Sequence, residues 1–180
     1  MTENSELRPA TGPVARRQHR ISTSIRAHSG MADYDYADQF TIDTVPGTAA
    51  TPEEWARTAL GEVAGARGQF VWRIVLGLRL RRRAAAGQAA GWPIIERGAT
   101  WITLGARSWL ISGRLVVELT GGTASVATFV RYERHMGERI WSAIAPGHRR
   151  FAPLLLTEAS RILSTRSSGR ATSGGPGRRT

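Results

Sequence analysis

The chain of 180 residues contains no cysteine and no lysine, and each absence excludes particular kinds of chemistry. Without cysteine the protein has no disulfide framework, no thiolate nucleophile and no Cys-ligated metal site. Without lysine its Gly-rich segments lack the residue that completes a nucleotide-binding phosphate loop. All 25 basic residues are therefore arginine, a bias typical of a genome that favours Arg codons.

Long apolar runs and recognisable catalytic motifs are missing as well. No stretch approaches the roughly 18–20 apolar residues of a membrane span, and the N-terminal arginines are not followed by the apolar stretch of a secretory signal. The four histidines show no metal-ligand spacing, and no Gly-x-Ser-x-Gly nucleophile elbow occurs. We therefore expect a cytoplasmic protein with no transmembrane segment, no metal and no cofactor.

The net charge of +11 lies mostly at the two ends of the chain. Residues 1–32 hold five Arg and two acids, and residues 164–180 hold four Arg and no acid. Both segments are polar and lack a sustained apolar period, so we expect them to be disordered. They can bind polyanions weakly by counterion release. A specific nucleic-acid module would show clustered basic residues with aromatic platforms, and neither is visible.

The residues between these ends, 33–163, have the length and apolar content of one domain. The expected organisation is thus a disordered segment over residues 1–32, a single folded domain, and a disordered tail over residues 164–180. Met31 stands almost directly before the domain, so we hypothesise that translation starts at Met31 rather than at Met1.

Two helices are expected after a short strand over residues 38–45. Residues 51–54 read Thr-Pro-Glu-Glu, which is a capping box with proline at the first helical position and predicts a helix over residues 52–63. A second helix is predicted over residues 70–83 from a buried apolar stripe at spacings of three and four, formed by Val71, Ile74, Val75 and Leu78. Its last turn carries the arginines Arg81–Arg83.

From residue 92 onward the apolar period changes to two, which is typical of strands with one buried face. The pattern predicts four antiparallel strands, over residues 93–97, 100–107, 109–119 and 123–134, with a Gly-Gly hairpin between the last two. A long helix is predicted over residues 136–163, with Trp141, His148 and Phe151 on its buried stripe and a bend or interruption at Pro146 and Pro153. This element order is that of an α+β helix-grip fold, in which a curved antiparallel sheet wraps a C-terminal helix and leaves an apolar cavity.

Two stretches of the sequence resemble a known family. The first runs from Tyr36-Ala37-Asp38 through Pro46-Gly47 to Pro52-Glu53-Glu54-Trp55-Ala56, and the second comprises Arg131-Tyr132, Gly137-Glu138-Arg139-Ile140-Trp141 and Ala145-Pro146-Gly147-His148-Arg149. Together they resemble a domain-of-unknown-function family of high-GC actinobacteria that is grouped with the START-like (Bet v 1-like) helix-grip proteins. The resemblance covers about 130 residues. It implies the fold and a cavity but no established activity, and Gly147 departs from the large apolar residue that the family pattern has before the histidine.

His148 is the leading candidate for a functional residue. Helical spacing places it on the same stripe as Trp141, facing the sheet. A partly buried imidazole acts as an acid, a base or a ligand anchor. The alternative is a core histidine whose nitrogens are bonded to a strand side chain.

Four further residues complete the predicted ligand-binding set, and Trp141, on the same stripe as His148, is one of them. Arg131, near the end of the last strand, can hold a carboxylate in a forked geometry, or it forms a salt bridge with Glu118 or Glu133. Tyr132 is its neighbour in the family motif. Arg114 lies in a polar row on the preceding strand, and such a row is more often a solvated sheet face than the floor of a cavity.

Three functions are compatible with these features. The first is the binding of a small apolar or weakly acidic ligand between the sheet and the C-terminal helix, with His148 and Arg131 as anchors. The second is a cyclase- or dehydratase-like enzyme with His148 as its acid–base residue. The third is a membrane- or partner-interaction module that uses the basic helix over residues 70–83.

Overall fold

The computed structural model describes residues 12–81 and 87–173. Its strands are β1 (Arg16–Arg17), β2 (Tyr36–Asp43), β3 (Gln88–Ala89), β4 (Trp92–Arg97), β5 (Trp101–Arg107), β6 (Ile111–Thr120) and β7 (Thr123–Tyr132). Its helical segments are α1 (Thr23–Ser29), α2 (Pro52–Arg57), η1 (Thr58–Val63), α3 (Gly65–Phe70), η2 (Val71–Val75) and α4 (His135–Ser173), where η1 and η2 are π-helical.

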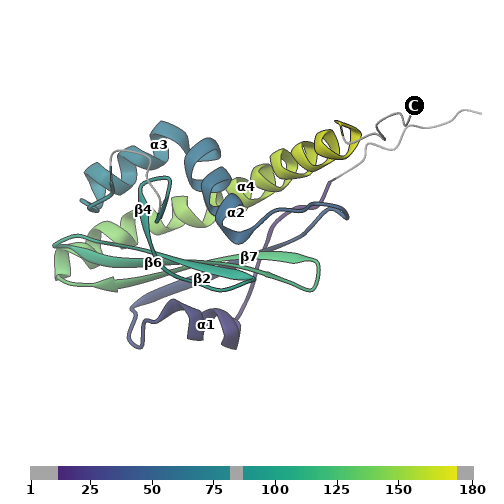
Figure 1. Cartoon of the computed structure of the whole chain (residues 1–180). Helices are drawn as coiled ribbons and strands as arrows, with labels where there is room; N and C mark the ends of the chain where they lie inside the picture. Colours follow the sequence, from purple (N-terminus) through teal and green to yellow (C-terminus); the bar gives the residue numbers. More distant parts are fainter. Residues whose placement is uncertain (1–11, 82–86, 174–180) are drawn as a thin grey trace, which may run out of the picture.

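The architecture is α+β, with seven strands in one curved antiparallel sheet in the order β1-β2-β7-β6-β5-β4-β3. We call the face of the sheet that packs against α2 and α4 its inner face, and the face that carries α1 its outer face (Figure 1). The predicted arrangement of an antiparallel sheet, a long C-terminal helix and shorter helices after the first long strand is confirmed.

The four strands predicted from the period-two pattern are β4 to β7. Gly121 and Gly122 have φ values of 58° and 79° and form the predicted turn between β6 and β7; this left-handed conformation is the one that favours glycine. In β6 and β7, alternate residues enter two different cores. Those of β6 divide cleanly, since Leu115 and Val117 join the main core on the inner face while Val116 joins a smaller core on the outer face.

The capping box forms as predicted at the start of α2. The Thr51 hydroxyl accepts from the Glu54 amide at 3.2 Å, and the Glu54 carboxylate accepts from the Thr51 amide at 2.7 Å. The helix continues into η1 and reaches Val63, as expected from the sequence. Trp55 and Ala59 are buried in the main core, so this segment covers the inner face of the sheet.

The prediction of a helix over residues 70–83 is wrong in its bounds. Helical structure runs from Gly65 to Val75 as α3 and η2, and Gly77 then adopts a φ of 60° that ends it. Ile74, assigned to the buried stripe, is 68% exposed. Arg81 lies beyond the helix, and the rest of the predicted last turn falls outside the described residues.

Residues 12–32, which we expected to be disordered, are part of the fold. Ser22 caps α1, and Ile25 is fully buried against Val116, Ala127 and Phe129 on the outer face of the sheet. The His28 ring stacks on Trp101 with centroids 4.0 Å apart. The sequence did not indicate this helix because only one of its seven residues is a large apolar side chain. Residues 1–11 lie outside the described part of the chain.

The C-terminal helix is longer than predicted and is not interrupted. α4 continues through Pro146 and Pro153 and extends over residues 164–173, which we had assigned to a disordered tail. Residues 174–180 lie outside the described part of the chain. Phe151, expected on the buried stripe, is exposed, and Leu156 is buried in its place.

Candidate functional site

The predicted site residue His148 faces the sheet and contacts a buried acid. Its Nε2 lies 3.1 Å from Oδ2 and 3.3 Å from Oδ1 of Asp38 on β2. The hydroxyl of Tyr36 donates to the same Oδ2 at 2.5 Å. The Asp38 side chain is 0% exposed and that of His148 is 24% exposed. A tyrosine, an aspartate and a histidine thus form one hydrogen-bonded cluster beneath α4.

Two regular periods bring these side chains together. Tyr36, Asp38 and Phe40 alternate along β2 and therefore share its inner face. Trp141 and His148 are seven residues apart in α4, which places them on one side of the helix. Edge-to-face and tilted contacts, with ring centroids 5.1 to 6.4 Å apart, join the rings of Tyr36, Phe40, Trp141 and His148. Aromatic rings therefore surround the imidazole.

Burial governs the electrostatics of this cluster. The pKa of Tyr36 is raised well above its ordinary value of 10.0, first because the phenol is buried and second because it is hydrogen-bonded to the Asp38 carboxylate. Nε2 of His148 is held by Asp38, and its Nδ1 bonds to no other group in the part of the chain that the structure describes. An aspartate that orients a partly exposed imidazole is an arrangement capable of general acid–base chemistry.

Of the other predicted site residues, Trp141 and Tyr132 also lie on the inner face. Trp141 is buried, and its indole N–H has no hydrogen-bond partner among the described residues. Tyr132 is partly buried against the main core. Its pKa is raised by burial and by the nearby negative charges of Asp35 and Glu138. Three of the five candidates are thus on the same side of the sheet.

Arg131 and Arg114 lie on the outer face, so the structure separates them from His148. Arg131 donates to Glu133 at 2.9 Å, which is one of the two salt bridges predicted as the alternative to carboxylate binding. The guanidinium of Arg114 lies over Gly105, where even a Cβ atom would overlap it. Burial lowers the pKa of Arg114, and the positive charge of Arg131 lowers it further. The expectation that these two arginines line a cavity with His148 is therefore wrong.

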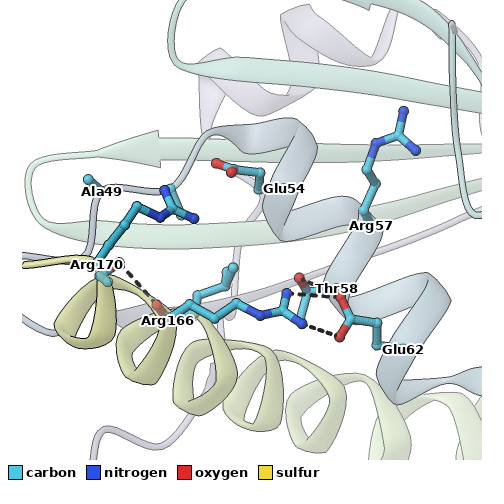
Figure 2. Close-up of a pocket in the computed structure, with 10 residues that line it drawn as sticks. Ala49, Glu54, Arg57, Thr58, Glu62, Arg166 and Arg170 are labelled. Atoms are coloured by element: carbon cyan, nitrogen blue, oxygen red, sulfur yellow. Dashed lines mark hydrogen bonds and ion pairs between the residues drawn. The ribbon is translucent and has the colours of Figure 1, made fainter. Parts of the chain in front are cut away.

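A pocket of about 160 Å³ occurs elsewhere, between α2–η1 and the C-terminal part of α4 (Figure 2). Its walls combine small apolar, acidic and basic side chains, namely Ala49, Ala50, Glu54, Arg57, Thr58, Glu62, Leu163, Arg166, Ser167 and Arg170. None of the five predicted residues lines it. Sequence reasoning missed this pocket because α4 was expected to end at Leu163, one turn before its basic wall.

One ion pair joins the two walls of this pocket. Arg166 on α4 holds Glu62 on η1 through two hydrogen bonds of 3.0 and 2.7 Å. The pKa of Glu62 is lowered chiefly by this contact. The pKa of Glu54 is lowered first by its bond to the Thr51 amide, and the positive charges of Arg170 and Arg166 lower it further. In Figure 2 the side chain of Arg57 points away from the other two arginines.

Residues 12–81 and 87–173 contain neither a metal-binding cluster nor a membrane-spanning helix. No group of three or more His, Asp or Glu side chains in these residues is placed to hold a metal ion. No helix in them is long and apolar enough to cross a bilayer. Comparison of the chain with protein-family models, with curated proteins and with solved structures finds no match.

Proposed function

We propose that the protein is a START-like ligand-binding protein, and that it binds a small, weakly acidic molecule with an apolar body in the pocket between α2–η1 and α4. The observation that carries this proposal is the pocket itself, with an apolar floor from Ala49, Ala50 and Leu163 and basic side chains above it. A volume of 160 Å³ lies below the roughly 300–1,000 Å³ typical of sites for drug-sized ligands. The ligand is therefore a small organic acid.

The free hydrogen-bonding capacity of the pocket favours an anion. Both carboxylates in its wall are already engaged, Glu62 by Arg166 and Glu54 by the amide and hydroxyl of Thr51. A guanidinium has five N–H donors, and Arg166 uses two of its own on Glu62. The remaining donors suit a carboxylate, which arginine binds in a charge-assisted geometry.

Binding can be tested with four probes of similar size: benzoate, hexanoate, neutral benzamide and cationic benzylamine. We expect the two acids to raise the melting temperature and to shift amide signals of residues in η1 and the end of α4, while benzamide and benzylamine do neither. Any ligand that binds only the folded state stabilises it in this way. A preference for benzylamine, or no response to any probe at millimolar concentration, would contradict the proposal.

Two variants locate the site. Arg166→Ala should abolish the response to benzoate, whereas Arg161→Ala should leave it unchanged. Arg161 is the matched control because it makes a comparable two-bond pair with Glu158 on the same helix but does not line the pocket. Ala49→Leu fills the pocket from an exposed position and should also block binding without loss of the fold.

A second function, an acid–base enzyme of the cyclase or dehydratase type, is favoured by the contact between His148 and Asp38. Its test is metabolite profiling of a cell extract incubated with the wild-type protein or with His148→Asn, which retains a donor for Asp38. A compound consumed by the wild type alone would support an enzyme. Identical profiles from two equally folded proteins would make His148 a structural residue.

A further inference from the structure

Three segments of the chain meet at one end of the sheet. The segment that follows η2 runs beside the end of β5, where the amide of Arg79 donates to the carbonyl of Arg107 at 3.1 Å. Gly77 lies against the indole of Trp109 in the β5–β6 turn. The β7–α4 junction joins the same turn, since the amide of Glu133 donates to the carbonyl of Leu110 at 2.9 Å.

Large apolar side chains are exposed on two of these segments and on η2, directly before the third. Ile74 near the end of η2 is 68% exposed, Trp109 in the β5–β6 turn is 62% exposed, and Met136 at the start of α4 is 49% exposed. Single exposed apolar residues are ordinary on a protein surface, but several on adjoining segments indicate a contact surface. Trp109 is the most informative, because tryptophan is enriched where an apolar phase meets water.

The same end carries several arginines, together with the acids Glu133, Glu138 and Asp35. Arg79, Arg134 and Arg139 are exposed, and none of them has an acidic partner in the part of the chain that the structure describes. Arg107 and Arg131 share one carboxylate, that of Glu133, at 3.6 and 2.9 Å. We call this surface the basic tip; it consists of Ile74, Arg79, Trp109, Arg134, Met136 and Arg139.

We propose that the basic tip docks on an anionic lipid surface. Arginines attract the negative potential of a bilayer containing acidic lipids, and the apolar side chains between them enter the boundary between headgroups and acyl chains. No segment crosses the membrane in this arrangement; the protein lies on it.

The basic tip and the ligand pocket are independent. The tip includes the first turn of α4, whereas the pocket is lined by residues 163–170 of the same helix. At 1.5 Å per residue the two sites lie roughly 40 Å apart along the helix. A protein docked through its tip therefore leaves the pocket open to solvent. Failure of either proposal has no bearing on the other.

The test is co-sedimentation of the purified full chain with vesicles of phosphatidylcholine alone or with one quarter phosphatidylserine. We expect binding to the anionic vesicles at low salt, and its loss at high salt because surface charges are then screened. Arg134→Ala with Arg139→Ala should weaken binding about 25-fold, since each arginine near an anionic surface contributes roughly fivefold. Trp109→Ala should weaken it by roughly tenfold or more, from the apolar area it loses.

Matched variants control for charge and for hydrophobicity. Arg20→Ala with Arg26→Ala removes the same charge from the N-terminal segment and should cause a much smaller loss than the tip variants. Leu154→Ala removes an apolar side chain that is 63% exposed, about as exposed as Trp109, but lies far along α4 from the tip. Absence of binding to anionic vesicles at low salt would overturn the proposal. So would equal losses in tip and control variants, or a change of oligomeric state in Trp109→Ala with vesicle binding unaltered.

Discussion

Asp38 is the residue whose setting most constrains the chemistry of this protein. Its carboxylate is removed from solvent and is shared by a phenol from its own strand and an imidazole from α4. A buried charge is tolerated only when it is paired and hydrogen-bonded. The contacts of His148 therefore stabilise the fold whether or not the protein is an enzyme, and variants of this cluster must be tested for folding before activity is interpreted.

Tyr36→Phe should change how stability depends on pH. The pKa of Tyr36 is raised above 10.0, so above that pH the folded state keeps a proton that the unfolded chain releases. The stability linked to this proton is complete below pH 10 and is lost as the pH rises beyond it. We expect Tyr36→Phe to lower the free energy of unfolding at pH 7 by about 2 kcal/mol, because the bond to Asp38 is lost. Between pH 9 and pH 11 the free energy of unfolding, measured in urea, should decrease less steeply in this variant than in the wild type.

Tyr34→Phe is the matched control for this prediction. The Tyr34 ring packs edge to face on Phe129 on the outer face, and no hydrogen bond of its hydroxyl is found in the part of the chain that the structure describes. The stability of Tyr34→Phe should depend on pH in the same way as that of the wild type. Parallel alkaline losses in wild type and Tyr36→Phe would show that the buried phenol is not the group responsible.

At the scale of elements, substitution of two glycines of α4 by alanine should change the stability of the protein in opposite directions. A Cβ atom on Gly137 would overlap the carbonyl oxygen of Leu110, whereas one on Gly147 would meet nothing within 4 Å. Gly137→Ala should therefore destabilise the protein by about 2 kcal/mol or more, because backbone must move. Gly147→Ala should stabilise it by roughly 0.5–1 kcal/mol, because alanine is the better helix former. Thermal and urea unfolding of both variants check this pair; similar effects in both would contradict the close approach at Gly137.

Several elements of the fold show what a local sequence pattern can and cannot predict. Capping residues and strand alternation are local signals, and they correctly placed α2 and the strands β4 to β7. The inward position of His148 followed from helical spacing. The exposure of Ile74 and Phe151 did not, because a spacing of three or four identifies a face of a helix but not how far its neighbours cover that face.

The candidate site was predicted only in part for a related reason. Tyr132 and Arg131 are adjacent on one strand and so must point to opposite faces, which the alternation of β7 already implied. Asp38 was also detectable, as the single acid between the apolar or aromatic inner positions of β2. Its pairing with His148 was not, since the two residues are 110 positions apart and only the packing of α4 on β2 brings them together.

At the scale of the whole molecule, the N-terminal segment is part of the folded domain. Deletion of residues 1–30 would expose Val116, Ala127 and Phe129 on the outer face and remove the buried Ile25. Burial of a single Ile or Phe side chain contributes roughly 1.5–3 kcal/mol, so we expect the deletion to cost at least about 3 kcal/mol in urea unfolding. Ile25→Arg should cause a comparable loss in the full chain, whereas Arg26→Ala on the exposed side of α1 should not.

The hypothesis of a translation start at Met31 makes a separate prediction, because it would leave the native protein without α1. N-terminal mass spectrometry of that protein would decide the matter, and peptides from residues 1–30 would refute the hypothesis. An intact α1 in the native protein would agree with the close fit of this helix against the sheet.

The short strand β1 has a further consequence for the behaviour of the protein at high concentration. Arg16 pairs with Thr41 and Arg17 with Phe40, and the amide of Gln18 continues the ladder to the Gln39 carbonyl. They cover part of one edge of β2, an eight-residue strand whose other edge pairs with β7. An uncovered strand edge is a template for pairing with another chain. Loss of the first 30 residues would therefore uncover this edge and favour pairing of the sheet with that of another molecule, whereas in the intact chain two charged residues cover part of the edge.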